Sequence, residues 1–254
     1  MKLALFLLVI LAQAQSTKIA FEAAAIKPNN SGRLGGGIDR MPARIRVINA
    51  SLKLCIEVAF NVREFQIAGG PGWLDTDRFD IDAVAAEPFK DGEDRVMLQT
   101  LLADRFGLAI HRETQERAGY ALVPGRNGAK LTPAKSDDPS SMFSSTPSGD
   151  ITWTAPAITM SRMAEALSGR TGLKVVDQTG IEGKFDVSLQ WTPDAGTGPR
   201  LSKSGEPLAA PPADAIPGPT LFTAIQEKLG LRLESKKVPV EVIVIDRATR
   251  PSEN

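Results

Sequence analysis

The chain has 254 residues, 42% of them hydrophobic and 24% charged, so it is long enough to bury a core without a metal or a disulfide. Its 30 basic and 30 acidic residues give a formal net charge of +0, which argues against nucleic acid or an anionic membrane as a general partner. One cysteine and one histidine exclude an internal disulfide and a zinc site built from His and Cys ligands.

Residues 1–14 are typical of a secretory signal peptide. Lys2 precedes an apolar run over residues 3–11, and Ala12-Gln13-Ala14 fits the small-x-small cleavage rule. The run is too short to cross about 30 Å of hydrocarbon. We therefore expect cleavage near Ala14 and export to the periplasm or the extracellular space, with no transmembrane segment in the mature chain. An uncleaved anchor is the alternative.

Residues 15–124 predict a first α+β half. After an additional strand in "TKIAFEAAAIKPN", residues 44–49 predict a strand, and "SLKLCIEVAF" predicts a helix that Ser51 or Asn49 can cap. Strands follow at "REFQIAG" and at "RFDIDAVA", where apolar and acidic residues alternate. The next helix ends at Gly107 and precedes two strands, "LAIHRE" and "GYALVPG".

Residues 150–254 predict a second half with the same order of elements. Thr159 caps its first helix, Gly230 ends its second, and "KFDV" repeats "RFDI". The last strand, "VEVIVIDR", is almost continuously apolar, so we place it centrally in its sheet. Residues 125–149 read as a linker. Residues 192–219 contain no aromatic residue, so we expect a disordered loop there.

The predicted fold is therefore α+β, with two duplicated β-α-β-β-α-β-β halves. Each half is expected to be an antiparallel sheet with both helices on one face, in a ferredoxin-like order.

The stretch "GGPGWLDTDRFDI" has an unusual density of special residues. It occupies the same place as "VVDQTGIEGKFDV" in the second half, so we interpret it as a structured turn whose Trp73 folds over the edge of the core. The alternative is a ligand-binding site formed by Trp73, Asp75, Asp77 and Arg78.

Other candidate chemistry has a simpler interpretation. Asp80 and Asp82 lie on the outer face of a strand, and the spacing of the nearby acids does not fit a calcium loop. His111 falls on the polar face of a strand, and Cys55 falls on the apolar stripe of a helix. The glycine-rich residues 31–40 lack the ending of a phosphate loop, so we expect a flexible loop there and not a nucleotide site. We therefore expect no catalytic residues, no cofactor and no metal.

Several longer motifs resemble one known family. They are "FEAAAIKPN", "GGPGWLDTDRFDIDA", "LLADRFGLAIHRETQERAGYALV", "VVDQTGIEGKFDVSLQWTP" and "VEVIVIDRATRPSEN". Together they resemble an exported family of unknown function from soil acidobacteria, a Soli-type family (domain of unknown function 3738). The resemblance implies an extracytoplasmic protein, and a binding or sensing role, because some relatives carry the domain behind a membrane metallopeptidase of the antibiotic-sensor type.

The sequence thus favours an exported, non-catalytic binding or sensing module whose partner is a protein or a cell-envelope component. The repeated order of elements offers sheet edges and a groove between the halves, which suit strand addition or partner docking. Each half also resembles the short N-terminal domains of secretins and TonB-dependent receptors, which bind other proteins, although this analogy is at the level of the fold only. One alternative is an extracytoplasmic hydrolase that uses Asp75, Asp77 or Asp80 with a raised pKa. Another is a sensor whose ligand lies beside Trp73 and Arg78.

Overall fold

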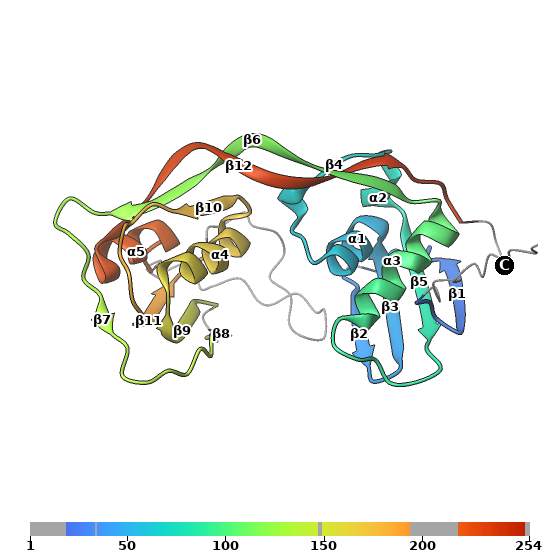
Figure 1. Cartoon of the computed structure of the whole chain (residues 1–254), viewed down its shortest axis with the longest axis horizontal. Helices are drawn as coiled ribbons and strands as arrows, with labels where there is room; N and C mark the ends of the chain where they lie inside the picture. The colour runs from blue at the N-terminus through green and yellow to red at the C-terminus, as the bar shows by residue number, and fades with distance from the viewer. Residues whose placement is uncertain (1–18, 34, 147–148, 194–217, 252–254) are drawn as a thin grey trace, which may run out of the picture.

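The computed structural model describes residues 19–33, 35–146, 149–193 and 218–251 (Figure 1). These residues form a mixed α+β protein with twelve strands in three four-stranded sheets and with five α-helices. Two lobes lie at the two ends of the molecule, and a long ribbon of two strands connects them (Figure 1).

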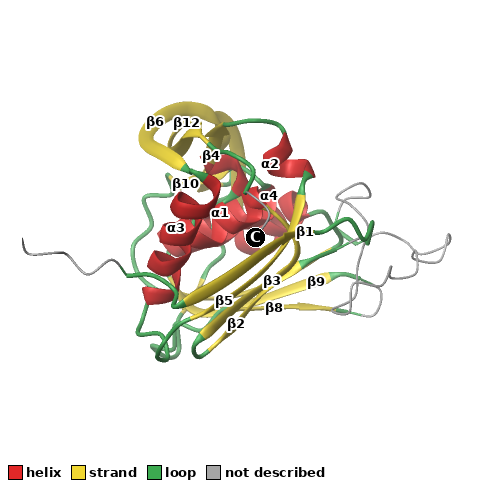
Figure 2. Ribbon diagram, turned by 90° about the vertical axis from the view of Figure 1, so that its right-hand side faces the viewer, coloured by secondary structure: helices red, strands yellow, loops and turns green. Residues whose placement is uncertain are grey.

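The first lobe is built on an antiparallel sheet of strand order β1-β5-β3-β2. Helices α1 and α3 cover one face of this sheet and separate it from the ribbon (Figure 2). The elements of the lobe are β1 (Ala23–Pro28), β2 (Gly37–Met41), β3 (Arg44–Ser51), α1 (Leu52–Phe60), α2 (Trp73–Thr76), β5 (Arg78–Val84) and α3 (Glu93–Phe106).

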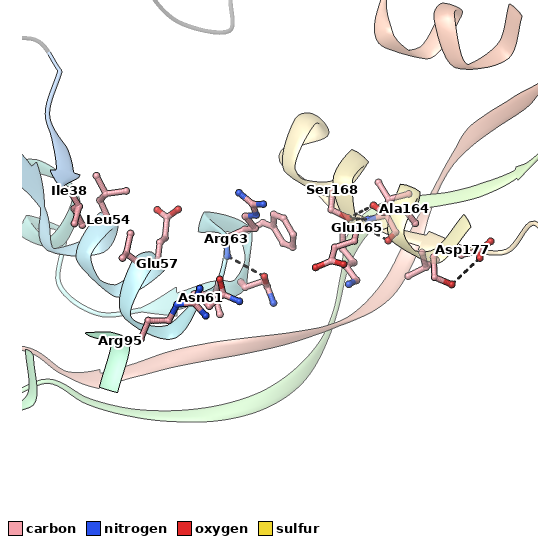
Figure 3. Close-up of a pocket in the computed structure, with 18 of the residues that line it drawn as sticks. Ile38, Leu54, Glu57, Asn61, Arg63, Arg95, Ala164, Glu165, Ser168 and Asp177 are labelled. Carbon is pink, nitrogen blue, oxygen red and sulfur yellow. Dashed lines mark hydrogen bonds between the residues drawn. The ribbon is translucent and has the colours of Figure 1, made fainter. Parts of the chain in front are cut away.

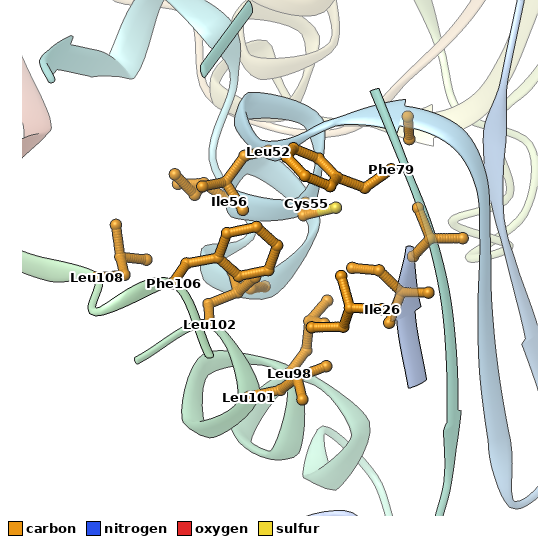
Figure 4. Close-up of a cluster of buried hydrophobic side chains, with 14 of the residues drawn as sticks. Ile26, Leu52, Cys55, Ile56, Phe79, Leu98, Leu101, Leu102, Phe106 and Leu108 are labelled. Carbon is orange, nitrogen blue, oxygen red and sulfur yellow. The ribbon is translucent and has the colours of Figure 1, made fainter. Parts of the chain in front are cut away.

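Local sequence signals set the ends of these helices. The Ser51 hydroxyl accepts a hydrogen bond from the Leu54 amide at 3.2 Å, which makes Ser51 the predicted N-cap of α1. Gly107 ends α3 in the left-handed conformation, with φ of 55°. The apolar stripes of both helices then meet the sheet in one core, where Phe79 packs edge to face on Phe106 (Figure 4).

The second lobe is built on an antiparallel sheet of strand order β7-β11-β9-β8. Thr159 caps α4 and Gly230 ends α5, as predicted. The short edge strands β7 and β8 lie within residues 125–149, which we expected to be only a linker. The elements of the lobe are β7 (Thr132–Pro133), β8 (Met142–Ser145), β9 (Ile151–Ile158), α4 (Met160–Thr171), β11 (Phe185–Trp191) and α5 (Leu221–Leu229).

The third sheet, which we call the bridging sheet, takes strands from both parts of the chain in the order β10-β6-β12-β4. Its central pair is antiparallel, and each short outer strand is parallel to its neighbour. The central position of β12 confirms the prediction from its apolar sequence. The strands are β4 (Ile67–Gly69), β6 (Ala109–Pro124), β10 (Lys174–Asp177) and β12 (Leu231–Arg247).

The bridging sheet corrects two expectations. The strands predicted separately at "LAIHRE" and "GYALVPG" form one strand, β6, because the polar residues between them pair with β12 and face solvent. The expectation that all strands of a half would share one antiparallel sheet is also wrong. β4 and β10 leave the sheets of their lobes and each pairs in parallel with a ribbon strand.

A third correction concerns the glycine-rich residues 31–40, which we expected to be a flexible loop. Residues 37–41 form β2, which pairs with β3. The glycines explain this pairing, because a Cβ atom at Gly36 would lie 2.5 Å from the Ile48 carbonyl oxygen. Only a residue without a side chain lets the two backbones approach this closely.

Two predictions fall outside the described residues: the signal peptide at residues 1–14, and most of the disordered loop, at residues 194–217. At the flanks of that loop, the Thr192 amide donates to the Pro219 carbonyl at 3.0 Å. In the part of the chain that is described, none of the helices has both the length and the hydrophobicity needed to cross a membrane.

The environment of Cys55 gives a prediction for stability at high pH. The thiol is fully buried in the first lobe, and this burial raises its pKa to about 12. An unfolded chain has a thiol pKa of about 8.5, so above this pH the unfolded state loses a proton that the folded state keeps. The free energy of unfolding should therefore fall by about 1.4 kcal/mol for each further pH unit until the folded pKa is reached.

We expect the unfolding free energy of the wild type to drop by about 2 kcal/mol more than that of Cys55→Ala between about pH 8 and about pH 10. Urea unfolding of both proteins at the two pH values measures the difference. The alanine variant cancels the contributions of lysine and tyrosine titration, which both proteins share. Identical pH profiles would contradict the assignment.

Candidate functional site

A cleft of about 930 Å³ lies between the two lobes. One wall comes from α1, from the start of α3 and from the 3₁₀ turn η1 (Glu64–Gln66), and the other comes from α4 and β10 (Figure 3). The cleft therefore needs both lobes, and its charged side chains come from distant parts of the sequence. These are Arg40, Glu57, Arg63, Arg95, Glu165, Lys174 and Asp177.

The two walls are held together under the ribbon by a small apolar cluster. Val238, Val240 and Val242 of β12 are buried there against Phe65 of the first lobe and Val176 of β10. Two hydrogen bonds tie the η1 turn to the same ribbon. An Arg117 guanidinium nitrogen donates to the Phe65 carbonyl at 2.6 Å, and the Gln66 amide nitrogen donates to the Glu241 carbonyl at 3.2 Å.

Some polar groups of the second wall are already used to build it. The buried Ser168 hydroxyl donates to the Ala164 carbonyl and accepts from the Val175 amide, both at 2.8 Å, and so joins α4 to β10. The Asp177 carboxylate accepts from the Ser161 hydroxyl at 3.2 Å and from the Thr179 amide at 2.9 Å. These groups shape the wall, because their hydrogen-bonding capacity is largely satisfied within the protein.

Glu57 is an acidic residue of the first wall whose pKa is raised. It is half-buried on α1, and burial, aided by the negative charge of Glu64, raises the pKa of its carboxyl. Glu57 therefore holds its proton to a higher pH than an exposed glutamate does. A protonated carboxyl in a cleft is a hydrogen-bond donor as well as an acceptor.

The four residues of the predicted turn lie outside this cleft, at the edge of the first lobe. Trp73 begins the short helix α2, packs edge to face on Phe79 at 6.4 Å, and lies under the Arg250 guanidinium at 5.2 Å. Arg78 begins β5 and is exposed. The structured turn and the position of Trp73 over the core edge are confirmed.

The acids of the turn are paired within the protein. Asp75 pairs with Lys53 at 2.9 Å, and Asp77 pairs with Arg250 at 2.7 Å. The hydrogen bond from Arg250 lowers the pKa of Asp77, which is opposite to the shift that the hydrolase alternative requires of this residue. A ligand role for Trp73, Asp75, Asp77 and Arg78 stays a prediction.

The other residues considered from sequence have structural partners. The Asp80 carboxylate accepts from the Asn29 side chain at 2.9 Å and from the Asn49 amide at 2.8 Å, and Asp82 pairs with Arg44. His111 is exposed, as predicted, with Nδ1 2.8 Å from an Asp246 oxygen. Among the residues placed by the structure, no group of three or more His, Cys, Asp and Glu side chains is suited to a metal ion.

A groove between the halves was predicted, but the residues that line the cleft were not. Arg63 and Glu165 are far apart in the chain, and neither belongs to a motif. Their proximity depends on the crossed pairing of β4 and β10 with the ribbon, which no local pattern encodes. The short polar segment "NVRE" after α1 was the available signal, because Asn61 ends that helix in the left-handed conformation and directs the chain toward the cleft.

By its fold and its cleft, the chain is a two-lobed α+β protein whose lobes are joined by a β-ribbon. A family model described as "Protein of unknown function (DUF3738)" matches residues 53–248, and the chain belongs to this family. No curated protein and no solved structure shows significant similarity to the chain.

Proposed function

We propose that the protein is an exported, non-catalytic binding or sensing module that holds a protein or a cell-envelope component in the cleft between its lobes. The observation that carries the proposal is the cleft of about 930 Å³. It is large enough for a short segment of a partner, and it lies where the two lobes meet, which is a common place for binding sites. Its walls carry charges of both signs.

Export and duplication are parts of the same proposal. Lys2, the apolar run after it and the Ala12-Gln13-Ala14 sequence support a periplasmic or extracellular location. The order β3-α1-β4-β5-α3-β6 and the order β9-α4-β10-β11-α5-β12 support an origin by duplication of a unit with ferredoxin-like element order. β4 pairs with β12 and β10 pairs with β6, so the second strand of each order lies beside the last strand of the other.

Hydrolysis by Asp75, Asp77 or Asp80 remains the alternative function. Asp75 and Asp77 pair with Lys53 and Arg250, and the hydrogen bond from Arg250 lowers the pKa of Asp77. The hydrogen bonds that Asp80 accepts serve to hold β5 to the ends of β1 and β3. These contacts support the binding module over the hydrolase.

Site-specific photo-cross-linking in the producing cells tests where a partner binds. The photoreactive residue benzoylphenylalanine is placed singly at three positions of the full chain. Val62 lies in the cleft, Asp75 lies in the turn beside Trp73, and Ser188 faces solvent on β11. We expect one discrete cross-linked product from the Val62 position in the envelope or extracellular fraction.

The other two positions provide the controls. A product from Asp75 without one from Val62 would move the site to the turn, and equal products from Ser188 would show non-specific contact. Turnover of a substrate that Asp80→Asn abolishes in a folded protein would support the hydrolase instead. Mass spectrometry of the same material reads the N-terminus, and an intact Met1 on soluble cytoplasmic protein would contradict export.

A further inference from the structure

Three arginines converge on a second cavity that adjoins the cleft. The cavity has a volume of about 380 Å³ and is lined by Arg63 of the first lobe and by Arg162 and Arg170 of α4. Arg63 and Glu165 line both cavities, so the two spaces are neighbours. We call this second cavity the arginine pocket.

The three guanidinium groups lack an acidic partner among the described residues. Across residues 19–33, 35–146, 149–193 and 218–251, none of them forms an ion pair. Glu165 lines the same pocket, yet it is outside ion-pairing distance of all three. Three cations facing one cavity, with a single carboxylate near them, leave a surplus of positive charge there.

Aromatic rings pack against the guanidinium of Arg170. Its guanidinium lies 3.8 Å from the centre of the Phe143 ring, and Phe143 stacks on the fully buried Trp153 at 5.3 Å. The Trp153 indole nitrogen in turn donates to the Ser141 hydroxyl at 2.9 Å. The arginine is therefore positioned by packing before any ligand arrives, which reduces the entropy cost of binding.

Arg63 approaches the same helix from the opposite lobe. Gly169 lies beside Arg170 on α4, and a Cβ atom placed on it would be 3.4 Å from the Arg63 guanidinium carbon. A glycine inside a helix is destabilising relative to alanine. Here it provides the space in which a guanidinium can lie against the helix. Burial and the nearby positive charge of Arg63 both lower the pKa of Arg170, as expected for like charges in proximity.

We propose that the arginine pocket binds an oxyanion group, a carboxylate or a phosphate, of the molecule that occupies the cleft. This inference rests on the proposed function and names the chemistry of its ligand. Guanidinium groups form paired, charge-assisted hydrogen bonds with both kinds of oxyanion. Bound between Arg63 and Arg170, such a group would also neutralise the repulsion between two cations that belong to different lobes.

Calorimetric titration of the full protein at low ionic strength tests the proposal with three probes: inorganic phosphate, citrate and pentaglutamate. We expect at least one of them to bind, with affinity that falls as salt is raised. Arg63→Gln and Arg170→Gln should each weaken that binding about tenfold or more, because each removes a charged donor. Arg46→Gln is the matched control, since Arg46 is exposed on β3 and lines neither cavity.

The outcomes separate the two proposals. Binding of phosphate alone assigns the oxyanion to phosphate, and binding of citrate or pentaglutamate assigns it to carboxylate; both support the pocket. Absence of binding by all three probes, or equal loss in Arg46→Gln, would overturn it. A cleft cross-link from Val62 that persists in Arg63→Gln and Arg170→Gln would overturn the arginine pocket while leaving the binding module intact.

Discussion

Replacing Trp153 with alanine should lower the free energy of unfolding by about 3–5 kcal/mol, the range found when a large aromatic side chain is removed from a packed core. Trp153 is fully buried in the second lobe, where it stacks on Phe143 and packs among the side chains of α4, α5 and β11. The substitution also leaves the Ser141 hydroxyl without its donor. Urea unfolding followed by circular dichroism measures the change.

Trp73→Ala is the matched control for this prediction. Trp73 is only partly buried and packs at the edge of the first core, so its loss should cost less than half as much as the loss of Trp153. Equal costs for the two substitutions would contradict the assignment of Trp153 to the centre of the second core. Trp153→Phe should keep most of the stacking on Phe143 and give an intermediate loss.

Replacing Gly119 with alanine should separate β10 from the ribbon and destabilise the protein by about 1–3 kcal/mol, the usual cost of overpacking. Gly119 lies on β6 between two neighbouring strands, and an added Cβ would be 2.6 Å from the Lys174 carbonyl oxygen. The Lys174 carbonyl belongs to the backbone and cannot rotate away as a flexible side chain can. The start of β10 must therefore move to relieve the clash. Hydrogen exchange should show faster exchange of the amides of residues 174–177.

Gly37→Ala provides the comparison. Gly37 begins β2, and a Cβ atom there would meet nothing within 4 Å. The substitution should leave the free energy of unfolding unchanged or raise it by up to about 1 kcal/mol, because glycine weakens a strand relative to alanine. If Gly119→Ala and Gly37→Ala have the same effect, the close contact between β6 and β10 is not the cause.

The helices and most strands could be predicted because their signals are local. Ser51, Thr159, Gly107 and Gly230 set helix ends through contacts within a few residues. Alternation along "RFDIDAVA" predicted β5, whose inward residues Phe79 and Ile81 are buried. The short edge strands were harder to recognise. β2 lies in a glycine-rich stretch, and β7 and β8 lie in a segment whose composition favours a loop.

The bridging sheet and the residues that line the cleft could not be predicted in the same way. The strands β4 and β10 span three and four residues, and the choice of a neighbour for so short a strand depends on the tertiary fold. The turn at residues 73–78 attracted attention because its residues are adjacent in sequence. Arg63 and Arg170 meet only after two lobes have packed, so their shared cavity leaves no local pattern.

The pairing of β4 with β12 also constrains the order in which the chain can acquire its structure. Ile67 pairs with Ile243, and Thr249 donates its amide to the Phe106 carbonyl at 2.7 Å, so residues 243–249 contact elements that lie far earlier in the chain. The bridging sheet cannot form before β12 is present, because β12 is the antiparallel partner of β6 along the whole length of that strand. Contacts between such distant residues form slowly. The cleft between the lobes therefore takes shape only after residues 231–247 have joined the bridging sheet.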